Sequence, residues 1–151
     1  MGYIQELRKI IGSRPIVLTG VNIIVFNERN EILLQRRTDT GDWGLIGGIL
    51  ELGESLEEAA HRELFEEAGL RTYDLKHITI LSGADMYYKY PNGDEIYNVI
   101  SIYETRSFIG EPRVNDDEGL EVEFFSIDKQ IPEINGMTNK ILYKSGYINW
   151  L

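Results

Sequence analysis

The sequence predicts an α/β fold built on a mixed β-sheet, and three observations lead to this prediction. Strand-like segments precede and follow one strong central helix, and a second helix closes the chain. This order is typical of a mixed sheet, whereas a parallel sheet would need strands and helices that alternate regularly. The 151 residues suffice for one domain with a substantial core, and 42% of them are hydrophobic, as in ordinary globular proteins. We therefore expect a single domain over residues 1–151.

The first elements are a short helix and two strands. Residues 4–11 place aliphatic side chains on one side of a predicted helix, which a glycine and a proline then end. Residues 16–26 and 31–37 are rich in β-branched and aliphatic residues, and the sequence NERN separates them. They predict a β-hairpin. Residues 45–50 are apolar with glycines and predict a strand that runs into a loop.

The clearest helix spans residues 55–68. Ser55 is suited to cap its first turn, Glu58 completes a capping box three residues later, and Gly69 stands where a helix commonly ends. The remaining predicted elements are strands at 76–82, 96–106 and 120–127, with the turn sequence YPNGDE before the second of these, and a closing helix at 138–148.

Composition and charge exclude several classes of function. The chain has no cysteine, which rules out disulfides, zinc–thiolate sites and a cysteine nucleophile. We see no signal peptide, and the longest apolar stretch is too short to span a bilayer and contains Asn22. A cytoplasmic protein without a membrane segment is therefore expected. The net charge of −10 disfavours extended contact with nucleic acid, although a metal-loaded site can still bind phosphate.

The central helix carries an unusual concentration of carboxylates. At about 100° per residue, Glu63, Glu66 and Glu67 fall within roughly a third of the helix circumference, beside an apolar stripe that runs from Leu56 to Ala68. Like charges this close repel each other unless solvent or a cation relieves them. Such oxygen ligands suit Mg²⁺ or Mn²⁺. A solvated acidic face is the alternative, and it is the better interpretation of the neighbouring glutamates in the first turn.

The spacing of this segment resembles the Nudix box, G-x5-E-x7-R-E-U-x-E-E-x-G-U, where U is an aliphatic residue. The matching positions, within residues 48–70, are Gly48, Glu54, Arg62, Glu63, Leu64, Glu66, Glu67, Gly69 and Leu70. Every fixed position is filled, so the motif is specific. The length and the flanking strands also resemble single-domain, MutT-like members of the family. One departure is Ile46, where members often have a proline that stiffens the loop.

The resemblance implies an α/β/α sandwich that hydrolyses nucleoside diphosphates linked to another moiety, with Mg²⁺ or Mn²⁺ in the site. By position, Glu63, Glu66 and Glu67 would be metal ligands, together with a main-chain carbonyl near Gly47. Glu54 and Arg62 would form a charge pair that ties the loop to the helix and orients Glu63.

The general base is left open between two residues. Glu66 is one candidate, acting through a metal-bound water. Glu118 is the other, because some MutT-like relatives carry a metal-binding or basic glutamate in a loop about six residues before an aromatic, here Phe124. A plain turn residue is an equally good interpretation of Glu118.

Specificity in this family lies outside the box. Tyr87, Tyr88 and Tyr90 cluster before the predicted turn and are candidates to stack on a base, Tyr87 and Tyr88 first among them, although tyrosines in strands more often only pack. Arg36 and Arg37 are candidates to bind substrate oxygens, and the alternation of a strand allows only one of them to face the site.

Three further expectations concern function and assembly. The first alternative to hydrolysis is a Nudix-fold domain that senses a nucleotide without cleaving it; such domains usually lose box glutamates, which this chain retains. The second alternative is a pyrophosphohydrolase of RNA 5′ ends. Many family members are homodimers, and the N-terminal helix is a candidate for such an interface.

Overall fold

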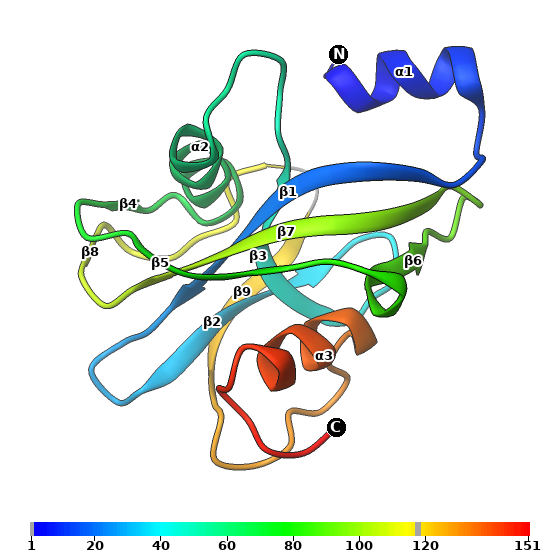
Figure 1. Cartoon of the computed structure of the whole chain (residues 1–151). Coiled ribbons are helices and arrows are strands. Elements are labelled where there is room, and N and C mark those ends of the chain that lie inside the picture. The colour runs from blue at the N-terminus through cyan, green and yellow to red at the C-terminus, as the bar shows by residue number, and fades with distance from the viewer. Residues whose placement is uncertain (1, 117–118) are drawn as a thin grey trace.

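A seven-stranded mixed sheet with helices on both faces organises the part of the chain that the computed structural model describes, residues 2–116 and 119–151 (Figure 1). The strand order is β5-β7-β1-β3-β2-β9, and β6 also pairs with β7. The elements are α1 (Tyr3–Ile11), β1 (Ile16–Val25), β2 (Glu31–Arg37), β3 (Trp43–Ile49), α2 (Leu56–Ala68), β4 (Arg71–Thr72), β5 (Lys76–Leu81), the 3₁₀ turn η1 (Ala84–Met86), β6 (Tyr87–Lys89), β7 (Glu95–Thr105), β8 (Phe108–Ile109), β9 (Gly119–Ser126) and α3 (Gly136–Lys144). This arrangement confirms the predicted mixed-sheet α/β class.

The pairing predicted for the first two strands is wrong. β1 and β2 approach each other only at their turn, through a bridge between Phe26 and Ile32. Beyond it β3 lies between them and pairs antiparallel with both, as Asn22 opposite Gly47 and Gln35 opposite Gly44 illustrate. Each of the two strands needs hydrogen-bond partners for its main-chain groups along both edges, and β3 provides the partners along one edge of each. The two strands are therefore separated in the sheet. The other edge of β1 pairs in parallel with β7, and that of β2 pairs with β9.

Local capping explains the position of α2. The Glu58 amide donates to Ser55 Oγ at 3.1 Å, and the Ser55 amide donates to Glu58 Oε1 at 3.1 Å, which completes the predicted capping box. At the other end Gly69 adopts the left-handed conformation at φ +70°, and its amide donates to the carbonyl of Phe65. Both ends predicted from sequence are thus confirmed, and together they determine which residues the helix presents to the sheet.

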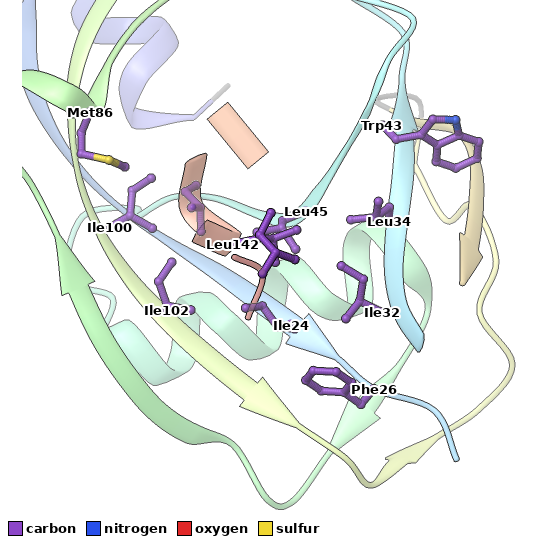
Figure 2. Close-up of a cluster of buried hydrophobic side chains, with 12 residues drawn as sticks. Ile24, Phe26, Ile32, Leu34, Trp43, Leu45, Met86, Ile100, Ile102 and Leu142 are labelled. Atoms are coloured by element: carbon purple, nitrogen blue, oxygen red, sulfur yellow. The ribbon is translucent and has the colours of Figure 1, made fainter. Parts of the chain in front are cut away.

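The two faces of the sheet bury separate hydrophobic clusters. On the α3 face, side chains from β1, β2, β3 and β7 meet Leu142 of α3 and Met86 of η1 (Figure 2). On the α2 face, Val21, Ile23 and Tyr103 pack against the alanines and Leu64 of α2. Because strand side chains alternate between faces, Val21, Ile23 and Val25 of β1 join the cluster under α2, whereas Ile24 joins the cluster under α3.

The closing helix is shorter than predicted. It spans Gly136–Lys144 rather than 138–148, and Asn135 caps it by accepting hydrogen bonds from the amides of Met137 and Thr138. Gly146 lies just beyond its end with φ +85°, a conformation that glycine adopts readily and that does not continue a helix. Ile148 still reaches the core from the following turn.

The other predicted elements match the structure within two residues at their ends, and no ranges were predicted for β4, β6, β8 and η1. Among the described residues, no helix is long and apolar enough to cross a membrane.

Candidate active site

The helix α2 presents its carboxylates to the end of β3. Glu63 and Glu67 are buried, with 7% and 3% of their surface exposed, whereas about half of the Glu66 side chain is exposed. All three line a groove of about 660 Å³, together with Gly47 and Gly48 of β3. We call this the carboxylate groove. The structure therefore brings together the four residues that the sequence proposed as metal ligands.

Arg62 connects the carboxylates to the loop that precedes the helix. Its Nε donates to Glu54 Oε2 at 2.6 Å and its Nη2 to Glu54 Oε1 at 2.9 Å, so the pair is bidentate. Nη2 also donates to the carbonyl of Ile49. Nη1 donates to Glu63 Oε1 at 2.8 Å and to Glu66 Oε2 at 3.2 Å. One guanidinium thus joins β3, the loop and α2.

Arg62 and Glu54 each stabilise the charged form of the other. The hydrogen bond from Arg62 is the main cause that holds the pKa of Glu54 below its usual value. The same hydrogen bond raises the pKa of Arg62, and the nearby Glu63 charge adds to this effect. Both groups therefore stay charged at neutral pH, as a bidentate pair of this kind requires.

Two glycines allow the strand to pass close to its neighbours. A Cβ at Gly48 would lie 2.5 Å from Glu63 Oε1, and a Cβ at Gly47 would lie 2.1 Å from the carbonyl oxygen of Val21. Gly47 also has φ +156°, which L-residues with a side chain rarely adopt. Only glycine permits this backbone path beside the carboxylates.

Glu67 is held by two donors, one of which sequence reasoning missed. The Gly47 amide donates to Glu67 Oε1 at 2.7 Å, and Gln35 Nε2 donates to Glu67 Oε2 at 2.5 Å. Gln35 comes from β2 and is almost fully buried. The alternation of the strand was a usable signal, because Gln35 shares a face of the sheet with Leu33, which packs under α2.

A second cavity adjoins the groove on the α3 side of the sheet. It measures about 110 Å³, and we call it the sheet pocket; its lining includes Asn22, Tyr88, Asn98, Asn135, Met137 and Thr138. Gly47, Gly48, Ile49, Arg37 and Tyr90 line both cavities. The two cavities thus meet at the end of β3, where the glycines leave space.

Of the two neighbouring arginines, the structure brings Arg37 to the cavities. Its Nε and Nη2 donate to the two carboxylate oxygens of Asp39, each at 2.9 Å. Burial by itself would lower the pKa of Arg37, but its hydrogen bond and charge interaction with Asp39 outweigh this and raise it. Arg36 points elsewhere: it donates to the carbonyl of Gly41 and lies near the Glu121 and Glu133 carboxylates.

Of the two neighbouring tyrosines, Tyr87 and Tyr88, only Tyr88 lines a cavity. Tyr88 lines the sheet pocket and contacts Tyr90 edge-on, with 4.9 Å between the ring centroids. Tyr87 lies outside both cavities; its hydroxyl donates to Glu95 and its ring contacts Tyr97. Tyr90, the third tyrosine of this cluster, lines both cavities, and its spacing of two residues from Tyr88 puts both rings on one side of an extended segment. The other predicted residue, Glu118, lies outside the described residues.

The N-terminal helix forms one wall of the carboxylate groove, which sequence reasoning did not anticipate. Gly2, Ile4, Gln5 and Arg8 contribute to the lining. The amide of Tyr3 donates to Glu51 Oε2 at 2.8 Å, which ties the start of α1 to the loop before α2.

Arg8 holds the other end of α1. Its guanidinium donates to the carbonyls of Gly12, Arg14 and Glu95. The last of these contacts links α1 to the start of β7.

No group of three or more His, Asp or Glu side chains in the described part of the chain is already arranged to hold a metal ion. Arg62 occupies oxygens of Glu63 and Glu66, while Gly47 and Gln35 occupy those of Glu67. The carboxylates are gathered but engaged with protein donors.

Comparison with known proteins agrees with this geometry. The NUDIX domain family model matches residues 18–142. An ADP-ribose pyrophosphatase of Methanocaldococcus jannaschii is 33% identical over 129 residues, which cover 83% of this chain and 70% of that protein. An NAD-capped RNA hydrolase of Actinobacillus succinogenes is 26% identical over 80% of this chain, but the chain spans only 44% of its length.

Among solved structures, a MutT NUDIX hydrolase from Burkholderia pseudomallei superposes with a TM-score of 0.69 at 27% identity, covering 85% of this chain and 96% of the other. The match of the family model over most of the chain, the fold and the arrangement of the box residues agree. This chain belongs to the NUDIX domain family.

Proposed function

We propose that this protein is a divalent-metal-dependent pyrophosphohydrolase that cleaves a nucleoside diphosphate linked to another moiety. The observation that carries the proposal is the meeting of two cavities at the end of β3. One of them gathers Glu63, Glu66 and Glu67 of α2, and the other is lined by asparagine side chains and two tyrosines. A substrate with a diphosphate between two moieties matches this arrangement, because the diphosphate would lie at the junction.

The residues of the groove fit Mg²⁺ or Mn²⁺. Their donor set consists of the carboxylates of Glu63, Glu66 and Glu67 and the main-chain carbonyl of Gly47, all hard oxygen ligands of the kind such ions prefer. The glycine backbone beside Glu63 leaves room that a Cβ would fill. When bound, the ion would neutralise charge on the diphosphate and lower the pKa of a coordinated water.

The chain's own residues would then divide the remaining work. Arg62, held by Glu54 in two hydrogen bonds, keeps Glu63 oriented toward the groove. Glu66 is the most exposed of the three carboxylates and would accept the proton of the attacking water. Arg37 lines both cavities and remains charged, so its guanidinium would bind phosphate oxygens at the junction.

The sheet pocket would receive the nucleoside. The side chains of Asn22 and Asn98 donate from Nδ2 to the carbonyls of Ile46 and Met86. Their carbonyl oxygens accept no hydrogen bond from the described residues, so they can pair with donors on a base. Tyr88 offers an aromatic face. The similarity to an ADP-ribose pyrophosphatase, over 83% of this chain and 70% of that protein, makes a nucleoside diphosphate sugar the first substrate class to test.

We also infer that α1 belongs to the same functional unit as residues 18–142, although it precedes them. Its contacts through Tyr3 and Arg8 tie it to the box loop and to β7, and four residues in and before it line the groove. One domain would then include both the box and the N-terminal helix.

The proposal is tested by incubating the protein with Mg²⁺ or Mn²⁺ and a panel of substrates, and recording product masses. The panel contains ADP-ribose, nucleotide sugars, diadenosine polyphosphates, nucleoside triphosphates, oxidised nucleotides, and NAD-capped and triphosphorylated RNA. The variant Glu66→Gln should keep the fold and lose most turnover. Glu57→Gln is the matched control, because it removes the same charge from an exposed position of the same helix outside the groove.

Cleavage within the diphosphate, lost in Glu66→Gln and retained in Glu57→Gln, is the expected result. Absence of cleavage across the panel in both metals, with nucleotide binding intact, would overturn the proposal and favour a sensing domain.

A further inference from the structure

The strand β2 places a polar side chain beneath the carboxylate groove. Gln35 is 1% exposed and lies on the face of the sheet that α2 covers. Its neighbour on that face, Leu33, is packed among the alanines and Leu64 of α2. An apolar residue at position 35 would continue this packing, so the presence of an amide calls for a physical reason.

The amide is engaged at one end only. Nε2 donates to Glu67 Oε2 at 2.5 Å, whereas Oε1 is buried and has no hydrogen-bond partner among the described residues. The opposite orientation of the amide would place Oε1 against a carboxylate oxygen, which is repulsive, so the observed orientation is the favourable one. A buried carbonyl without a partner is costly. The bond to Glu67 is therefore the contact that accounts for the amide.

Glu67 is consequently fixed through both of its oxygens. Gln35 holds Oε2 and the amide of Gly47 holds Oε1 at 2.7 Å. Each carboxylate oxygen has two lone-pair sites, so an oxygen that accepts one hydrogen bond can still bind a cation. Donors behind a metal-binding carboxylate orient it and limit the conformational freedom it would lose when it binds the ion.

We propose that Gln35 is a positioning residue of the metal site, which acts through Glu67 and is not itself a ligand. The inference rests on the metal site of the proposed function. It assigns a role in metal affinity to a residue of β2, outside the segment 48–70 that carries the family motif. Loss of the N–H donor of Gln35 should therefore weaken binding of the metal ion even though all the carboxylates are retained.

The test measures Mn²⁺ binding without any nucleotide, by following free Mn²⁺ in electron paramagnetic resonance titrations. Gln35→Met keeps a side chain of similar length and removes the donor. Gln35→Asn keeps an amide but withdraws it by one methylene. Leu33→Met is the matched control, because it alters a buried side chain on the same strand and face and keeps all the donors.

Both Gln35 variants should bind Mn²⁺ about 10- to 100-fold more weakly, the usual effect of losing such an outer partner, whereas Leu33→Met should bind as the native protein does. Native-like affinity in either Gln35 variant would overturn the proposal. Circular dichroism and urea unfolding verify that the variants fold. Loss of folding in both Gln35 variants would overturn the proposal in favour of a purely structural role for Gln35.

A double-mutant cycle with Glu67→Ala tests the route of the effect. If Gln35 acts through Glu67, then adding Gln35→Met to Glu67→Ala should change Mn²⁺ affinity by less than about twofold. A further full loss in the double variant would contradict the positioning role. Failure of the native protein to bind Mn²⁺ would instead contradict the metal dependence in the proposed function, so the two failures are distinguishable.

Discussion

Two adjacent glycines of β3 should respond in opposite ways to the same substitution. In Gly48→Ala the new Cβ would lie 2.5 Å from Oε1 and 2.8 Å from Cδ of Glu63, both at the far end of a flexible side chain. In Gly47→Ala it would lie 2.1 Å from the carbonyl oxygen of Val21, which is backbone in the middle of β1. The first clash can be relieved by moving a carboxylate, and the second only by moving a strand.

The expected magnitudes follow from these distances. Ordinary contact begins near 3.4 Å, so Glu63 must retreat by about 0.9 Å, and a misplacement of about 1 Å in a catalytic group costs roughly 100-fold in rate. The stability of Gly48→Ala should change by no more than about 1 kcal/mol, because alanine also restricts the unfolded chain. Gly47→Ala combines an unfavourable φ with a backbone clash, and each contributes about 1–3 kcal/mol.

Urea unfolding at neutral pH and steady-state kinetics on the preferred substrate provide the measurements, with Mn²⁺ affinity as a readout independent of turnover. Gly48→Ala should unfold near the native midpoint yet bind Mn²⁺ weakly and turn over slowly. Gly47→Ala should lose at least about 2 kcal/mol of stability. Native kcat/KM in Gly48→Ala, or a larger loss of stability in Gly48→Ala than in Gly47→Ala, would refute the reasoning.

Two further predictions concern charged groups. In the folded protein Arg62 lowers the pKa of Glu54 below its ordinary value of 4.5. The pair therefore stabilises the fold above pH 4.5 and loses this effect as the pH falls through the folded-state pKa. Glu54→Gln should cost about 2 kcal/mol in urea unfolding at pH 7 and progressively less below pH 4.5, and a cost independent of pH would exclude this account. Arg37→Ala should raise KM about tenfold or more, as loss of a charge-assisted phosphate contact does. Arg36→Ala should leave KM unchanged, because the Arg36 side chain makes its contacts outside both cavities. Equal effects of the two variants on KM would contradict the assignment of Arg37.

The local parts of the structure were readable from the sequence. Ser55, Glu58 and Gly69 define the ends of α2 through contacts within four residues, so the sequence predicts them without knowledge of the fold. The spacing of Glu63, Glu66 and Glu67 on a helix likewise puts the carboxylates on one side, and the family resemblance assigned them a chemistry. Arg62 and Glu54 meet in the structure as that resemblance implied.

Other features depended on which segments lie side by side. NERN indicated a hairpin, but β3 separates the two strands because pairing over long sequence separations determines the order of a sheet. That order places Gln35 beneath Glu67 and brings Arg37 rather than Arg36 to the junction of the cavities. The alternation of side chains along a strand predicts that either Arg36 or Arg37 faces the site, but it does not identify which of them does.

The sequence by itself thus determined the helix that carries the carboxylates, because its capping and its spacing are local properties of the chain. Only the tertiary structure decided what surrounds them: the buried amide of Gln35, the two cavities that meet at Gly47 and Gly48, and the wall formed by α1. These neighbours come from segments distant in sequence. Their contacts arise from packing of the whole sheet, which no local pattern records.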